Sequence, residues 1–114
     1  MSKASYEEQF AQWNELRGHF KRAKSNKDYQ SVINTGLKII ELGESVPKLG
    51  IMTALFERDT ADAYLKTGNI SLATLYYEKA VKSFEKYRVT QRLHNPDDFL
   101  SDIEAVQKKL NKLK

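Results

Sequence analysis

The stretch "TADAYLKTGNISLATLYYEKAVKSF", residues 60–84, decides the fold. Its apolar residues recur at spacings of three and four on both sides of a turn at Thr67-Gly68-Asn69. That spacing is typical of α-helices with one buried face, and Gly followed by Asn is a common helix stop and restart. The stretch therefore predicts two amphipathic helices that fold back on each other as a hairpin, with Asn69 or Ser71 as the cap of the second helix.

Small and aromatic residues are interspersed along this predicted hairpin. Ala61 and Ala73 have short side chains, so they allow two helices to approach each other closely. Tyr64 and Tyr77 are large enough to fill the space that remains beside them. The regular small residues therefore indicate close helix–helix contact.

The same helical spacing continues along the rest of the chain, where no strand-like alternation of apolar and polar residues occurs. The predicted helices cover about residues 5–24, 27–43, 49–66, 69–88 and 96–113. The predicted fold class is all-α.

Three of the predicted helix ends depend on capping residues. Ser5, with Glu8 three residues later, has the form of a capping box. Gly43 is suited to end the second helix in the left-handed conformation. The segment "NPDD", residues 95–98, offers an Asn cap, Pro at the first helical position and acids in the first turn. We therefore expect the last helix to begin at about Pro96.

Each predicted helix carries an apolar stripe. The stripe of the first helix is unusually aromatic and consists of Tyr6, Phe10, Trp13, Leu16, Phe20 and Ala23. The stripe of the third helix includes Met52, Phe56, Ala63 and Tyr64. The stripe of the last helix consists of Phe99, Ile103, Val106, Leu110 and Leu113. Gly36 lies inside the second helix, where its missing side chain lets another backbone come close.

The bulk composition is that of a helix-rich globular domain. A length of 114 residues predicts a single domain, residues 1–114, with one modest core. The chain has no cysteine, no apolar signal-peptide segment and no apolar run of about 20 residues, so we expect a cytoplasmic protein without membrane contact. The net charge of +4 is mildly basic and does not by itself single out nucleic acid as a partner.

Residues 60–80 resemble a tetratricopeptide repeat, a helical hairpin with small and aromatic residues at fixed positions. The matching residues are Ala61, Tyr64, Gly68, Ala73, Tyr77 and Ala80. The chain departs from the family pattern at Glu57, where the family usually has Trp, and at Thr60, where it has Leu. Glu85 stands where Pro often closes the repeat.

The resemblance implies a particular architecture. A weaker copy of the repeat covers about residues 5–43, the clearer copy covers about residues 49–88, and a capping helix follows at about residues 96–113. We therefore expect two antiparallel helical hairpins plus a C-terminal capping helix, packed as a short right-handed superhelix.

The resemblance also implies a binding surface, because in such repeats the first helix of each pair lines a concave groove. In the clearer repeat the groove positions are Leu55, Arg58, Asp62, Leu65 and Lys66, and in the weaker repeat they are Asn14, Arg17, Lys21 and Lys24. Independently of the family, Arg17, Lys21 and Lys24 form a basic stripe at helical spacing. The alternative interpretation of this stripe is a solvated helix face.

We interpret the chain as a non-catalytic protein–protein interaction module that binds a peptide or a partner's helix, with acidic residues, in this basic groove. The only histidines are His19 and His94, and no catalytic or phosphate-binding motif occurs, so we expect no enzyme activity, cofactor or metal.

Two alternatives stay open. A structural homodimer, or a subunit of a larger assembly, would use the aromatic first helix or the fifth helix as its interface. A basic nucleic-acid accessory protein is the third interpretation, and it predicts affinity that falls steeply as the salt concentration rises.

Overall fold

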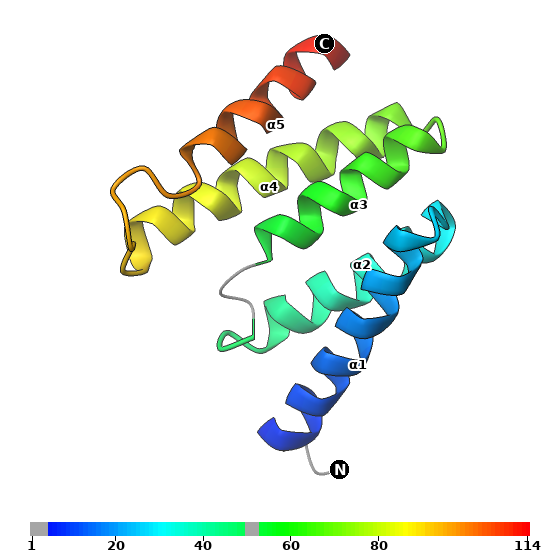
Figure 1. Cartoon of the computed structure of the whole chain (residues 1–114), viewed down its shortest axis with the longest axis vertical. Helices are drawn as coiled ribbons and strands as arrows, with labels where there is room; N and C mark the ends of the chain where they lie inside the picture. Colours follow the sequence, from blue (N-terminus) through cyan, green and yellow to red (C-terminus); the bar gives the residue numbers. More distant parts are fainter. Residues whose placement is uncertain (1–4, 50–52) are drawn as a thin grey trace.

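The computed structural model describes residues 5–49 and 53–114 of the chain. Within these ranges it contains five α-helices and no strand, which confirms the all-α prediction. The helices are α1 (Tyr6–Ser25), α2 (Tyr29–Ser45), α3 (Ala54–Lys66), α4 (Ile70–Thr90) and α5 (Leu100–Leu113). Figure 1 shows them from blue α1 to red α5.

Each helix packs against the next one along the chain, from α1 on α2 to α4 on α5 (Figure 1). Side chains also connect helices that are two apart. The ring of Phe56 in α3 meets Trp13 and Phe20 of α1 edge-on, and Lys109 of α5 donates a hydrogen bond to Asp62 of α3. The odd-numbered helices α1, α3 and α5 therefore contact each other in sequence.

The hairpin of residues 60–84 forms the centre of the core. Ala61, Ala73, Ala80 and Tyr77 are completely buried between α3 and the helices around it. Gly68 has a φ of +86°, which is the left-handed conformation that glycine adopts without strain. The small residues thus lie where the sequence predicts close helix contact.

Two predicted starts of helices are confirmed by hydrogen bonds. The Ser5 hydroxyl accepts from the backbone N–H of Glu8, at 3.2 Å, and begins α1. The Asn69 side chain accepts from the N–H of Leu72, also at 3.2 Å, and begins α4. Both bonds satisfy N–H groups that have no partner inside the helix.

The prediction that Gly43 ends the second helix is wrong. Gly43 is buried inside α2, which continues to Ser45. The hydroxyl of Ser45 donates to the carbonyl oxygens of Glu41 and Leu42. The N–H of Val46 also donates to Leu42. These bonds satisfy the last carbonyls without a left-handed residue.

The prediction that α5 begins at Pro96 is also wrong, because α5 begins at Leu100. The carboxylate of Asp98 accepts from the backbone N–H groups of His94 and Asn95, which closes residues 94–98 into a turn. Phe99 then takes a left-handed backbone with a φ of 67°. Asp98 therefore caps the turn rather than the helix.

The apolar stripes are buried unevenly. Trp13, Phe20 and Ala23 of α1 are buried, whereas Tyr6 and Phe10 at its start are 43% and 46% exposed. The predicted stripe of α5 is confirmed by its buried residues Ile103, Val106 and Leu110.

Two further helix boundaries differ from the prediction. The third helix was predicted to start at about residue 49, whereas α3 starts at Ala54. Met52, part of the predicted stripe of this helix, lies outside the described residues. The helix α4 extends to Thr90, slightly beyond the predicted end.

Candidate functional site

A groove runs between α1 and α3. It holds about 560 Å³ and has an apolar floor made by Phe20, Leu55 and Phe56. The rings of Phe20 and Phe56 are 5.2 Å apart at an angle of 73°, the edge-to-face geometry that aromatic pairs favour. The polar side chains that line this α1–α3 groove are Asn14, Arg17, Lys21, Lys24, Ser25, Arg58 and Asp59.

Cations dominate the lining of the groove. The groove is lined by four cations, Arg17, Lys21, Lys24 and Arg58, and by one carboxylate, that of Asp59. Arg17 and Lys21 are exposed, and among the described residues neither forms an ion pair. The groove therefore carries an excess of positive charge next to aromatic surface.

Asp59 links the two walls of the groove. Lys24 Nζ of α1 donates to Asp59 Oδ2 at 2.7 Å, and Arg58 Nε donates to Asp59 Oδ1 at 3.1 Å. The side chain of Asp59 is only 13% exposed, whereas that of Lys24 is 46% exposed. Partial burial strengthens such charge-assisted bonds relative to an ion pair in open water.

A second set of polar contacts connects α3 to α5. Arg58 Nη1 donates to Asp102 Oδ1 at 3.3 Å, and Lys109 Nζ donates to Asp62 Oδ1 at 2.8 Å. The hydroxyl of Tyr77, whose side chain is buried, also donates to Asp62. Burial and then this bond raise the pKa of Tyr77 above its usual range, so Tyr77 is a stable donor.

The structure divides the predicted site residues into two groups. Arg17, Lys21, Lys24 and Arg58 line the α1–α3 groove together. Asp62 lies one turn further along α3 and is paired with α5. Leu65 and Lys66, at the end of α3, are exposed and do not line this groove.

Two carboxylates of the candidate site were missed by the sequence interpretation. Asp59 lies on the same helical face as Leu55 and Asp62, at spacings of four and three, so helical geometry could have placed it in the groove. Asp102 pairs with a residue 44 positions away, and no local pattern in one sequence indicates that contact.

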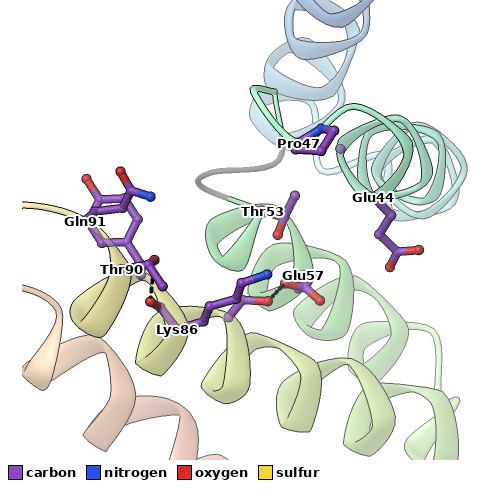
Figure 2. A pocket seen from close by; sticks show the side chains of 10 residues that line it. Glu44, Pro47, Thr53, Glu57, Lys86, Thr90 and Gln91 are labelled. Atoms are coloured by element: carbon purple, nitrogen blue, oxygen red, sulfur yellow. Dashed lines mark hydrogen bonds between the residues drawn. The ribbon is translucent and has the colours of Figure 1, made fainter.

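A second cavity, of about 480 Å³, lies where α2 ends, α3 begins and α4 ends (Figure 2). Glu57 of α3 is in its wall and is only 4% exposed. Ser83 of α4 donates a hydrogen bond to Glu57, and one of the dashed lines in Figure 2 ends at Glu57. Figure 2 also shows Glu44, Thr53, Lys86, Thr90 and Gln91 around this cavity.

Glu57 is a carboxyl group of this cavity whose pKa is raised. Burial raises its pKa above the ordinary value, and the hydrogen bonds from Ser83 and Thr53 and the charge of Lys79 oppose that rise only in part. Its hydrogen bond to Ser83 joins α3 to α4. We assign Glu57 a structural role, because the bond accounts for its position.

The described residues, 5–49 and 53–114, carry neither of two other features that bear on function. No three His, Cys, Asp or Glu side chains in these ranges are grouped so that they could hold a metal ion. None of the helices described is both long and apolar enough to cross a membrane.

Comparisons with protein families, with curated proteins and with solved structures find no match to this chain.

Proposed function

We propose that this protein is a non-catalytic interaction module that binds an acidic segment of another protein in the α1–α3 groove. The observation that carries the proposal is the lining of the groove, four cations and one carboxylate beside an aromatic floor. Acidic side chains would pair with the cations through charge-assisted hydrogen bonds, and an apolar side chain would cover the floor.

We also propose that the scaffold is a short tetratricopeptide-like superhelix. The packing of each helix on the next supports it, as does the complete burial of Ala61, Ala73 and Tyr77 at positions of the repeat pattern. In this arrangement α1 and α3 are the groove-lining helices, and α5 caps α4 with Ile103 and Val106.

The exposed pair Arg17 and Lys21 provides the sharpest test of this proposal. A library of displayed twelve-residue peptides is selected on the immobilised protein, and the bound peptides are sequenced. We expect enrichment of Asp and Glu around one aromatic or aliphatic residue. The double variant Arg17→Glu/Lys21→Glu should lose these peptides, since it reverses the charge of one wall.

The control is Lys38→Glu/Lys82→Glu, which makes the same change in net charge at exposed positions of α2 and α4. This variant should retain the selected peptides. If both double variants lose them equally, the attraction is a property of the total charge, and the groove is not the site. Selection of peptides without acidic enrichment would also oppose the proposal.

The exposed start of α1 favours a homodimer as a second candidate. Tyr6 and Phe10 are stacked at 6.1 Å and remain largely exposed. Sedimentation of the wild type and of Phe10→Ser over a range of concentrations tests it. A dimer that Phe10→Ser dissociates would support this candidate, and a monomer at all concentrations would exclude it.

A further inference from the structure

The cations of the α1–α3 groove fall into two sets. Arg17 and Lys21 have no ion-pair partner among the described residues and form an open half of the groove. Lys24 and Arg58 form a second half, in which both cations are already bonded to Asp59. Phe20 lies between Arg17 and Lys24 along α1 and contributes to the floor.

Asp59 fills the second half in the way that a ligand carboxylate would. One of its oxygens accepts from Lys24 and the other accepts from Arg58. Arg58 also donates to Asp102 of α5. A ligand carboxylate would have to displace the partly buried carboxylate of Asp59, which is fixed on α3. Its binding to Lys24 and Arg58 would therefore add little affinity.

The length of the groove limits the length of the segment. Its α1 wall runs from Asn14 to Ser25. At about 1.5 Å for each helical residue, this wall is roughly 16 Å long. An extended peptide covers about 3.3 Å for each residue, so the groove accommodates about five residues.

We propose that Asp59 is an internal competitor that makes the groove select an asymmetric ligand. The ligand is an extended segment of about five residues with acids over Arg17 and Lys21, an apolar side chain over Leu55 and Phe56, and no acid over Lys24. This inference deepens the proposed function and rests on it.

The test uses three fluorescein-labelled peptides with Gly-Ser flanks. Their central residues are Glu-Glu-Phe-Ser-Ser, Ser-Ser-Phe-Glu-Glu and Glu-Glu-Phe-Glu-Glu. Affinities are measured by fluorescence anisotropy with wild type, Asp59→Asn, Lys24→Gln and the double variant Asp59→Asn/Lys24→Gln. Circular dichroism confirms that each variant is folded at the temperature of the titration.

The wild type should bind the peptide with four acids no more than about threefold more tightly than the better of the two asymmetric peptides. Asp59→Asn should bind the peptide with four acids about tenfold more tightly than the wild type does, because Lys24 and Arg58 become available. In the wild type, Lys24→Gln should change the affinity for the peptide with four acids only slightly. In the Asp59→Asn background, Lys24→Gln should remove most of the gain in affinity for that peptide.

Asp62→Asn is the matched control, because it removes the same charge from the next turn of α3. It should leave the preference between the peptides unchanged. The inference is overturned if Asp59→Asn gives no larger gain in affinity than Asp62→Asn. It is also overturned if the wild type already binds the peptide with four acids more than about threefold more tightly than the better asymmetric peptide. If none of the peptides binds to the wild type or to Asp59→Asn, the proposed function fails together with the inference.

Discussion

Gly36 of α2 faces Thr60 of α3 so closely that a β-carbon on Gly36 would lie 2.1 Å from Thr60 Oγ1. The same β-carbon would lie 3.1 Å from Cε1 of Phe20, which belongs to the floor of the α1–α3 groove. Three helices therefore meet at one residue without a side chain. The contact couples the packing of the core to the position of the groove.

Gly36→Ala should destabilise the protein. Overpacking a core lowers the stability by about 1–3 kcal/mol, and the better helix propensity of Ala offsets about 1 kcal/mol of this loss. We expect a net loss of up to about 2 kcal/mol in the free energy of unfolding, measured by urea denaturation. The additional change Thr60→Ala should recover part of this loss, because it removes the closest atom.

The matched control for Gly36 is Gly18, inside α1. A β-carbon there would lie 3.5 Å from Arg22 Nη1, an ordinary contact distance. Gly18→Ala should therefore stabilise the protein by up to about 1 kcal/mol. If Gly36→Ala stabilised the protein as much as Gly18→Ala, the close contact between α2 and α3 would be wrong.

Glu57→Gln should stabilise the protein at pH 7. Burial raises the folded-state pKa of Glu57, so the folded state holds this proton more tightly than the unfolded state. The wild type is therefore less stable at pH values above the folded-state pKa of Glu57, where the buried carboxylate is charged. Its stability recovers as the pH falls through that pKa and the carboxylate is protonated. Each unit by which the pKa is raised costs about 1.4 kcal/mol at neutral pH.

Urea denaturation at pH 7 and at pH 4.5 measures this effect. The advantage of Glu57→Gln over the wild type should be present at pH 7 and smaller at pH 4.5. Glu85→Gln, an exposed substitution on α4, is the control and should show a smaller dependence on pH. An advantage of Glu57→Gln that is independent of pH would contradict a buried carboxylate at this position.

Phe99→Ala should weaken the attachment of α5. The ring of Phe99 is 5.7 Å from that of Phe84 and 5.2 Å from that of Tyr87, both on α4. Because Phe99 is only half-buried, we expect the free energy of unfolding to fall by about 2 kcal/mol, less than for a fully buried aromatic residue. Its neighbour Leu100 is 41% exposed, so Leu100→Ala should cost less than half as much in the same denaturation experiment.

The helices could be predicted from the sequence because their determinants are local. Spacings of three and four placed the apolar faces, and Ser5 and Asn69 form the predicted caps. Two of the wrongly predicted boundaries lie where a side chain bonds to backbone groups that the sequence pattern did not indicate. Ser45 satisfies the carbonyls at the end of α2, and Asp98 caps a turn ahead of α5.

The site could be predicted in part on both walls, since the resemblance to the repeat placed Leu55 and Arg58 of α3 in the groove. Arg17, Lys21 and Lys24 share a helical face, so their spacing placed them together. Asp59 pairs with Lys24 across 35 positions of sequence, and such a contact depends on how α1 and α3 pack. Glu57 occupies a position where the family pattern has Trp, a signal of altered packing that did not indicate a cavity by itself.

The most direct test of the binding groove is an NMR titration of ¹⁵N-labelled protein with the peptide that contains Glu-Glu-Phe-Glu-Glu. Backbone amide shifts are followed for the whole chain at near-physiological salt. We predict that the largest shifts occur at residues 14–25 of α1 and 55–59 of α3, the walls of the α1–α3 groove. Shifts confined to the start of α1, or centred on α2 and α4, would contradict it.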